Sequence, residues 1–322
     1  MTKTASIFAT SSQPLTLALL VLPQSSILEV ASTLDPMRSA NRHLGHEAYR
    51  WRVVSPDGSA VPLTCGIELP STGPLAAAEG ADALVVIAGF RQSEVATAPL
   101  IRDLSRMAPR FAAVGGIDAA AWVMARAGLL AGHRATVHWE DLEDLAAAFP
   151  SVEVVPDRWV IDRNRFTAGG AAPAADLMLH LIGSRHGLAL ARQVAASFLT
   201  TPRPGSEPQI AAPAAPDPRL DPRVAQAVAR MEAQIDAPAS TAETARAVGL
   251  SSRRLETLFR QSLQTTPAAF ALSLRLQSAR RMITDTRHPL AEVAVRTGFS
   301  SASALSRAFR QHFGQSPSQL RG

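Results

Sequence analysis

The chain has 322 residues, of which 47% are hydrophobic, and a formal net charge of +5. This length is enough for two domains of ordinary size, each with its own core. No uncharged apolar run reaches 18 residues, so we expect no transmembrane helix. The single cysteine, Cys65, excludes an intrachain disulfide framework and is typical of a cytoplasmic protein.

Residues 1–14 lack the long apolar segment of a signal peptide, and we expect them to form a flexible tail. Beyond them, apolar runs of strand length alternate with helical patterns. Strands are predicted at 15–22, 51–55, 83–89, 111–116, 152–155 and 159–161, and helices at 25–44, 118–127, 140–149 and 172–192. This alternation predicts an α/β domain over residues 15–200, with a mostly parallel sheet covered by helices on both faces. Ligands of such sheets bind outside the carboxyl ends of the strands.

Proline is frequent over residues 201–220, which predicts a semi-rigid linker. The region after it, 221–322, contains 14 arginines, no lysine and 7 acidic residues, a net charge of +7. The remaining residues therefore carry a net charge of −2. A basic small domain beside a nearly neutral large one suggests that the small domain alone binds nucleic acid.

A unit of sequence occurs twice in this basic region. The copies cover residues 242–267 and 291–317 and read AETARAVGLSSRRLETLFRQSLQTTP and AEVAVRTGFSSASALSRAFRQHFGQSP. Their offset is 49 residues up to the paired serines and 50 residues after them. A repeat of this period indicates a repeated supersecondary unit.

Each copy has the layout of a helix-turn-helix. A short alanine-rich helix is followed by a glycine, Gly249 or Gly298, that can end it, and by serines that can cap a second helix. The alternative is a purely structural pair of helical hairpins, but two copies in register favour DNA binding. The segment between them, 268–286, is predicted to be one helix about 30 Å long. That length approaches the ~34 Å between major-groove segments on one face of DNA, so the two second helices would enter successive grooves.

The region from about 221 to 321 resembles the AraC family DNA-binding domain throughout, and GFSSASALSRAFRQHFGQSPSQLR matches its signature closely. The resemblance implies an all-α domain with two helix-turn-helix units. It also implies two further arginines that contact phosphates or acidic core partners, Arg260 and Arg310. The implied base-reading positions are Arg253, Arg254, Glu256 and Thr257 in the first unit, and Ser303, Ala304 and Arg307 in the second.

Residues 112–140 and shorter stretches around 34–41, 49–58 and 167–182 resemble the class I glutamine amidotransferase-like fold in its PfpI-type branch, which is flavodoxin-like. The resemblance covers roughly residues 15–198, and its fusion to an AraC domain is the architecture of GlxA-type regulators. Enzymes of this fold carry a cysteine at a sharp strand-to-helix elbow and a histidine downstream. Here the elbow position holds Asp118 and the histidine position His138. We expect Cys65 to be a small packed residue rather than a nucleophile.

A carboxylate at the elbow cannot perform thiolate chemistry, but it could bind a cationic group of a small ligand. The resemblance implies that Asp118 and His138 have as neighbours Trp139, Trp122, Asp35 and Asn41. Simpler alternatives are that Asp118 only caps the following helix, that Trp122 belongs to the core, and that His138 is a buried structural histidine.

These features predict a ligand-responsive transcriptional regulator, an activator of the use of a small metabolite such as an amino acid or a methylated amine. Its expected partners are promoter DNA, a small effector, a second copy bound through the first domain, and RNA polymerase if the protein is an activator. We expect no catalytic residue, metal, cofactor or membrane contact. One rival is a PfpI-like hydrolase or lyase with a DNA-binding appendage; another is a DNA-binding protein whose first domain only dimerises.

Overall fold

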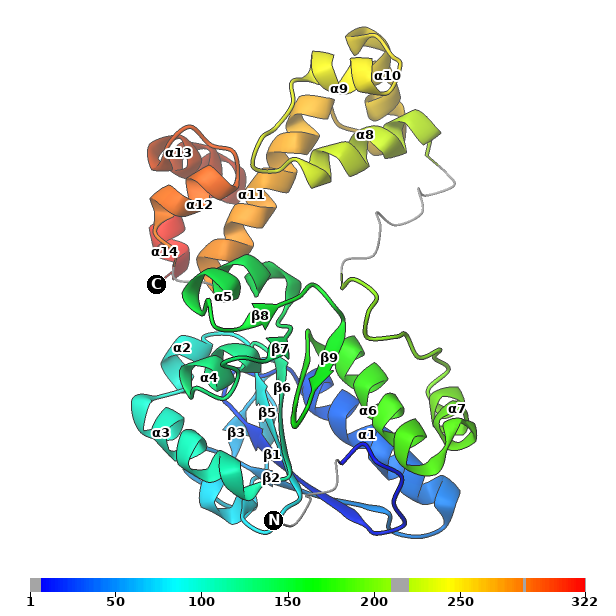
Figure 1. Cartoon of the computed structure of the whole chain (residues 1–322). Coiled ribbons are helices and arrows are strands. Elements are labelled where there is room, and N and C mark those ends of the chain that lie inside the picture. Colours follow the sequence, from blue (N-terminus) through cyan, green and yellow to red (C-terminus); the bar gives the residue numbers. More distant parts are fainter. Residues whose placement is uncertain (1–6, 210–219, 286–287, 322) are drawn as a thin grey trace. The chain divides into compact units, whose positions relative to one another are not determined.

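The computed structural model describes residues 7–209, 220–285 and 288–321. The chain divides into two compact units, Met1–Ile210 and Ala211–Gly322, here called the N-terminal and C-terminal domains (Figure 1). Each has hydrophobic cores of its own, as the composition predicted. No helix among the described residues is both long enough and apolar enough to cross a membrane.

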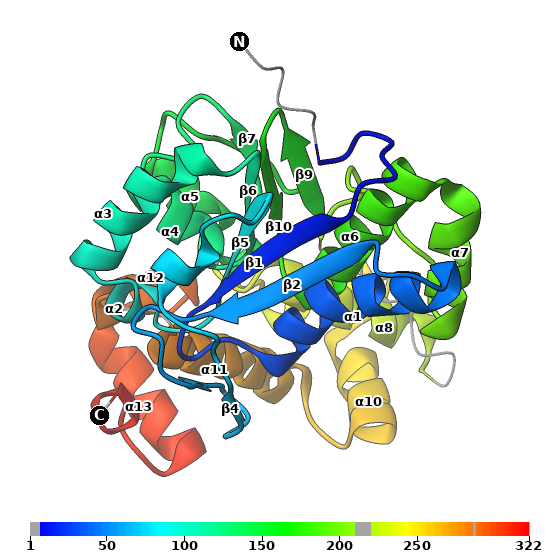
Figure 2. The same cartoon turned by 90° about the horizontal axis from the view of Figure 1, so that it is seen from below.

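The N-terminal domain is built on a six-stranded sheet with the strand order β2-β1-β5-β6-β10-β9 (Figure 2). All neighbouring strands run parallel except β9, which is antiparallel to β10, so the predicted mostly parallel sheet is confirmed. In sheet order the strands are β2 (Tyr49–Val54), β1 (Leu15–Val21), β5 (Ala83–Ala88), β6 (Ala113–Asp118), β10 (Arg165–Ala168) and β9 (Trp159–Asp162). Two small pairs lie outside it, β3 (Val61–Pro62) with β4 (Glu68–Leu69) and β7 (Arg134–Ala135) with β8 (Glu153–Val154).

Helices cover both faces of this sheet, which explains why β1 and β5 are almost wholly buried. One core contains side chains of α1 (Ile27–Leu44), α6 (Ala171–His186) and α7 (Leu188–Ser197). The opposite core contains side chains of α3 (Ala98–Met107), α4 (Ala120–Arg126) and α5 (Leu142–Ala148). The shorter elements are α2 (Gln92–Val95), η1 (Leu75–Ala78), η2 (Ala108–Arg110) and η3 (Trp139–Asp141).

The predicted helix 172–192 is two helices, because Gly187 interrupts it with a φ of 93°. That backbone conformation suits glycine and cannot continue a right-handed helix. The prediction was wrong at this point because an apolar helical pattern runs on through the glycine.

The expectation of a flexible tail is not met by residues 7–14. Ile7 is 4% exposed, and the Arg185 guanidinium donates hydrogen bonds to the carbonyl oxygens of Ile7 at 3.0 Å and Gln13 at 2.7 Å. The ring of Phe8 packs edge-on against that of Phe166. These residues therefore belong to the domain, and residues 1–6 lie outside the described part of the chain.

The predicted linker also begins later than expected. Arg158 N–H donates to the carbonyl oxygens of Gly205 and Glu207, and Arg203 N–H donates to Asp176 Oδ1. The side-chain amide of Gln209 donates to Thr136 Oγ1 at 2.7 Å and to the carbonyl of Val137 at 2.7 Å. Residues 203–209 are thus bound to the N-terminal domain. Residues 210–219 of the predicted linker lie outside the described part of the chain.

The C-terminal domain is all-α, as predicted. Its helices are α8 (Pro222–Ala233), α9 (Thr241–Ala247), α10 (Ser252–Leu263), α11 (Pro267–Asp285), α12 (Leu290–Arg296), α13 (Ala302–Phe313) and α14 (Pro317–Arg321). It has two small cores, one between α8, α9 and α10 and one between α12, α13 and α14. Helix α11 contributes to both, through Phe270 to the first and through Leu276 and Ile283 to the second.

A buried ion pair between Arg158 and Asp176 provides a test of this fold. Both side chains are 8% exposed, and the guanidinium donates to Asp176 Oδ2 at 3.1 and 2.7 Å. Asp176→Ala should lower the free energy of unfolding by about 3–5 kcal/mol, because the guanidinium stays buried without its counter-charge. Replacing both residues, Arg158→Met with Asp176→Leu, should recover most of that loss. Urea unfolding of the full chain measures both; a loss under about 1 kcal/mol for Asp176→Ala would contradict the account.

Candidate functional site

The carboxyl ends of the central strands bring the polar residues of the N-terminal domain together. Asp118 is the last residue of β6 and lies in register with Ala88, the last residue of β5. Gly169 follows the end of β10, the strand on the other side of β6. Asp118 has a φ of 60°, in the left-handed region, which costs a residue with a side chain about 1–2 kcal/mol. The turn between β6 and α4 therefore has the sharp elbow geometry predicted for it.

Asp118 is accompanied by a second carboxyl group, that of Glu29 near the start of α1. Burial, and then the neighbouring Glu29 carboxyl, raise the pKa of Asp118 well above its usual range. Burial likewise raises the pKa of Glu29 to about 7. Because two adjacent buried carboxyls cannot both ionise readily, one proton remains on the pair near neutral pH.

The Asp118 side chain has an unused hydrogen-bonding atom. Its Oδ1 is closed off from solvent and has no hydrogen-bond partner among the described residues. Helix α4 begins after Ala119, and no side chain accepts a hydrogen bond from its first turn. The alternative that Asp118 only caps this helix is therefore wrong. A buried acceptor without a partner is costly, so the site is one that a donor can stabilise.

His138 and Gly170 lie beside this carboxyl. A Cβ atom added at Gly170 would stand 3.8 Å from Asp118 Oδ1 and 3.9 Å from His138 Cδ2, so the three residues meet at one point. The His138 side chain is 37% exposed, with Nδ1 3.7 Å from Glu140 Oε2. His138 is thus not a buried structural histidine, and the structure does bring it to Asp118 as expected.

Two predicted neighbours lie elsewhere and have other partners. Asp35 is about half exposed on α1 and forms an ion pair of 2.6 Å with Arg38. Asn41 uses its whole amide to hold β2 to α1, accepting hydrogen bonds from Ala48 N and Tyr49 N and donating to Tyr49 O. The prediction was wrong for Asp35, because the carboxyl that accompanies Asp118 is Glu29, six residues earlier on α1. It was wrong for Asn41, because its amide is fully used between α1 and β2.

The two tryptophans differ in role. Trp122 packs against Phe149 in the core, and its Nε1 donates to Asp141 Oδ2 at 3.1 Å, so the core alternative holds for its ring. Burial raises the pKa of Asp141, which adds a third acidic group near the elbow. Trp139 is 41% exposed, and the centroids of the Trp139 and His138 rings lie 5.7 Å apart. The Trp139 ring is therefore accessible to solvent beside His138.

Three residues of the site were not predicted from the sequence: Glu29, Asp141 and Gly170. Glu29 also completes a capping box with Ser26, because its Oε2 accepts a hydrogen bond of 3.3 Å from the Ser26 backbone N–H. In the sequence, Glu29 is therefore explained by helix capping alone. Gly170 follows Gly169 directly after a strand, at the edge where ligands of such sheets bind. That paired glycine was the one available signal.

Cys65 lies between β3 and β4 and is exposed rather than packed as expected. No contact relates it to Asp118 among the described residues. The structure therefore gives it no part in the elbow.

In the C-terminal domain, both copies of the repeat form the predicted turns. Gly249 and Gly298 have φ values of 71° and 68° and end the first helix of each unit. Ser251 Oγ accepts a hydrogen bond from Arg254 N, and Ser301 Oγ accepts one from Ala304 N. The purely local stop and cap signals thus placed α10 and α13 correctly.

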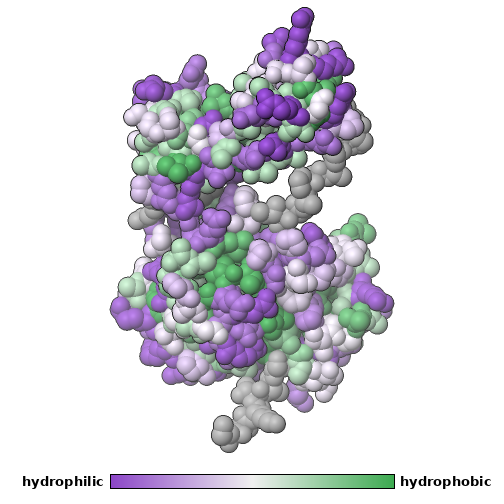
Figure 3. All heavy atoms as spheres, turned by 45° about the horizontal axis from the view of Figure 1, so that its top comes forward, coloured by the Kyte–Doolittle hydropathy of each residue, from purple (hydrophilic) through white to green (hydrophobic). Residues whose placement is uncertain are grey.

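Helices α10 and α13 each turn one face to their core and one to solvent. Leu255 and Phe259 are buried in α10, as are Leu305 and Phe309 in α13. Hydrophilic residues prevail on the surface of this domain seen in Figure 3. Of the predicted DNA contacts, Glu256, Thr257 and Ala304 are half-buried, and the exposed residues are Arg253, Arg254, Arg260, Ser303, Arg307 and Arg310.

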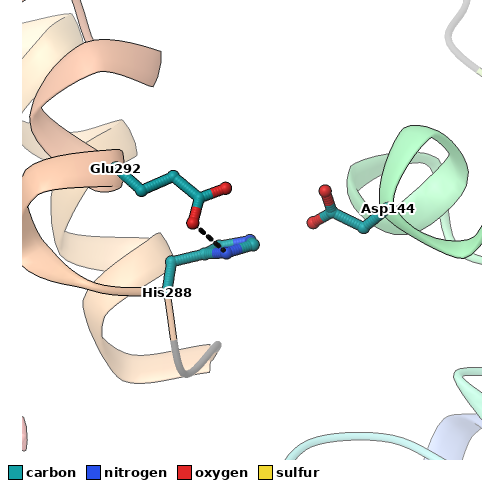
Figure 4. Close-up of side chains that lie close together, drawn as sticks. All are labelled: Asp144, His288 and Glu292. Carbon is teal, nitrogen blue, oxygen red and sulfur yellow. Dashed lines mark ion pairs between the residues drawn. The ribbon is translucent and has the colours of Figure 1, made fainter. Parts of the chain in front are cut away.

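Arg260 and Arg310 make no ion pair with any residue that the structure describes. Among these residues, neither arginine therefore has the acidic core partner that was one of its two expected contacts. By contrast, the Glu292 carboxylate on α12 lies 3.3 Å from His288 Nδ1 (Figure 4). Its other oxygen lies 2.9 Å from Arg296 Nη2. The acidic group of the second unit thus pairs with His288 and Arg296 and not with the arginines of α13.

The chain matches the DJ-1/PfpI family over residues 16–184 and a helix-turn-helix domain over residues 244–322. The HTH-type transcriptional regulator CdhR of Pseudomonas aeruginosa is 37% identical over 303 residues, 94% of this chain and 90% of that protein. The HTH-type transcriptional regulator GlxA of Rhizobium meliloti is 31% identical over 314 residues, 94% of each. The crystal structure of an AraC family transcriptional regulator from Pseudomonas putida covers 57% of this chain and 100% of its own, with 28% identity and a TM-score of 0.53.

The carboxyl pair predicts an unusual pH dependence of stability. The pKa of Glu29 is 4.5 when the side chain is free in the unfolded chain, and burial in the folded protein raises that pKa to about 7. Between these values the folded state binds more protons, so its free energy of unfolding falls as the pH rises. Glu29→Gln keeps the capping acceptor but removes this proton, and it should reduce the fall in melting temperature between about pH 5 and about pH 8.

Glu243→Gln is the matched control. Glu243 occupies the same capping-box position on α9, but hydrogen bonds from Ser240 lower its pKa instead. This substitution should leave the slope over that pH range unchanged. If the Glu29→Gln protein keeps the full wild-type slope, the two carboxyls do not share a buried proton.

Proposed function

Because the chain belongs to the family of helix-turn-helix transcriptional regulators with an N-terminal DJ-1/PfpI domain, we propose that it is a regulator whose DNA binding responds to a small cationic effector. The family establishes a DNA-binding transcriptional regulator. The observation that supports a cationic effector is the buried, unpartnered oxygen of Asp118 beside a second carboxyl.

The C-terminal domain acts on DNA through α10 and α13. Both helices present exposed arginines, and four of them form no ion pair with an acidic group of the described chain: Arg253, Arg260, Arg307 and Arg310. Because α11 has 19 residues, it is about 28 Å long, close to the ~34 Å repeat of the major groove on one face of DNA. The two helices therefore enter successive grooves, with Arg253 and Arg307 on base edges and Arg260 and Arg310 on phosphates.

The N-terminal domain binds the effector at the elbow. An ammonium or other small cation would lie against Asp118 and Glu29, with His138 and the exposed ring of Trp139 beside it. Ion pairing and a cation–π contact are the interactions that these groups offer. Amino acids and methylated amines carry such a cation, and the use of one of them is the process regulated.

The remaining parts of the proposal rest on the architecture that the chain shares with its family. They are a homodimer formed through the N-terminal domain and activation of transcription by contact with RNA polymerase. The domain is not an enzyme in this proposal, because Asp118 occupies the elbow where the related enzymes carry their cysteine. Turnover of a substrate that is lost on Asp118→Ala would restore the hydrolase or lyase alternative.

Arg253→Ala and Arg307→Ala should each relax base preference at one position, and the two positions should lie about one helical turn apart. Each should cost roughly 1–3 kcal/mol on the preferred sequence, because a base-edge hydrogen bond is lost. Arg260→Ala, on the same face of α10, should instead weaken binding to all sequences and lower its salt dependence. Selection of bound sequences from random DNA distinguishes these outcomes. Uniform weakening by Arg253→Ala would make that arginine a phosphate contact.

Asp118→Asn should leave folding and DNA binding intact but lower effector affinity more than tenfold. Asparagine keeps the size of the side chain but removes one of the two carboxyl groups that would hold the cation, at a cost of about 2–5 kcal/mol. A thermal-shift screen of amino acids, betaines and polyamines identifies the effector, since a ligand bound only by the folded state raises the melting temperature. Calorimetric titration then compares the two proteins.

Asp35→Asn is the control for Asp118→Asn, because that carboxylate already pairs with Arg38 at the surface. Its titration should overlay that of the wild type. Loss of affinity in Asp35→Asn but not in Asp118→Asn would place the cation on α1 and contradict the proposed site.

A further inference from the structure

The two helix-turn-helix units have the same plan but different surroundings at their turns. A Cβ added at Gly249 would meet nothing within 4 Å. A Cβ added at the equivalent Gly298 would lie 2.6 Å from Pro238 Cδ, 2.7 Å from Ile235 O and 3.0 Å from Asp236 O. Residues 235–238 connect α8 to α9 in the first half of the domain. The turn of the second unit is therefore packed against the first half, and only glycine allows so close an approach.

A second contact reaches the same turn from α11. Arg275 Nε donates to Thr297 O at 2.8 Å, and its Nη2 donates to Gly298 O at 2.5 Å. The guanidinium also lies 4.1 Å from the ring centroid of Phe299. It thus binds the carbonyls at the end of α12 as a fork and stacks on the next aromatic ring. Lysine, with a single ammonium, cannot reproduce that combination.

These contacts restrain a movement of α13 relative to α10 that would be possible if α11 alone separated the two halves of the domain. Along the chain, α10 is followed by α11 and α12 before α13, so a small bend or twist in α11 would displace α13. Arg275 joins α11 to the end of α12, and residues 235–238 join the first half of the domain to Gly298. Since α12 and α13 share a core, holding this turn holds α13 as well.

We propose that Arg275, Gly298 and residues 235–238 form a joint that fixes α13 relative to α10, and so sets the single spacing between the two DNA segments that the domain recognises. This inference rests on the proposed entry of both helices into successive grooves. A rigid joint makes binding cooperative at one spacing and unfavourable at others. A loose connection would let the second helix follow its segment when the spacing changes.

The test uses full-length protein and a DNA sequence that the wild type selects from random DNA. One base pair is inserted between the two recognised segments, which moves the second by ~3.4 Å and rotates it by about a tenth of a turn. The wild type should lose at least tenfold in affinity. Gly298→Ala and Arg275→Gln should bind the parent sequence more weakly, but they should lose less than threefold on insertion.

Gly249→Ala is the matched control for Gly298→Ala. It introduces the same left-handed alanine in the other unit, where no joint exists, and it should keep the wild-type penalty for the insertion. Arg275→Lys, which keeps the charge but not the fork, should fall between the wild type and Arg275→Gln. Circular dichroism confirms that each variant is folded, and Arg275→Gln provides the test if Gly298→Ala is not.

Three results would overturn the proposal, and they differ from one another. A wild type that tolerates the insertion would show that the two helices do not bind successive grooves together, and the proposed function would fail first. A sensitive wild type with equally sensitive joint variants would show that Arg275 and Gly298 only stabilise the domain. Relaxed spacing in Gly249→Ala would assign the effect to strain in the turn.

Discussion

The burial of two neighbouring carboxyl groups, Glu29 and Asp118, is the constraint on which the N-terminal domain depends. The parallel sheet ends there, and the chain makes room for the pair by omitting side chains. A Cβ at Gly89 would lie 2.9 Å from Gln24 O and 3.7 Å from Glu29 Oε1, and one at Gly170 would approach Asp118. The left-handed backbone of Asp118 adds strain. Strained, desolvated and partly unpartnered groups reduce stability unless a ligand offsets their cost.

Each of the two domains has its own cores and its own backbone restraint. In the N-terminal domain the restraint is the elbow; in the C-terminal domain it is the close approach of residues 235–238 to Gly298. The described chain leaves the N-terminal domain beside the elbow. The Gln209 amide fills the space that a side chain at Gly169 would need, and it donates a hydrogen bond to the carbonyl oxygen of Val137. Gly169 directly precedes Gly170 in the chain, and Val137 directly precedes His138. The elbow and the last described residue of the N-terminal domain therefore share one neighbourhood.

Local signals made the C-terminal domain predictable. Glycine stops, serine caps and apolar spacing act within a few residues, so α10 and α13 were placed within one residue of the predicted serines. The asymmetry between Gly249 and Gly298 was not predictable, because the contact at Gly298 comes from residues about sixty positions earlier.

In the N-terminal domain too, local features were predictable from the sequence and features that depend on distant contacts were not. Asp118 was found because the elbow pattern is local. Glu29 was missed and Asp35 wrongly chosen, because the face that α1 turns to β6 is decided by packing over the whole helix. The six residue steps from one to the other span about 9 Å along its axis. Strand β10 was missed because its four residues alternate too briefly to give a signal.

The proposed function requires that the effector site and the DNA-binding helices be thermodynamically coupled in one molecule. Coupling is reciprocal: if the effector changes DNA affinity by some factor, DNA must change effector affinity by the same factor, commonly about 5- to 150-fold. The direct measurement is a pair of titrations on full-length protein, DNA binding with and without saturating effector and effector binding with and without saturating DNA. We predict equal factors different from one in the wild type. Factors of one in both titrations, with effector and DNA each bound tightly, would contradict the claim.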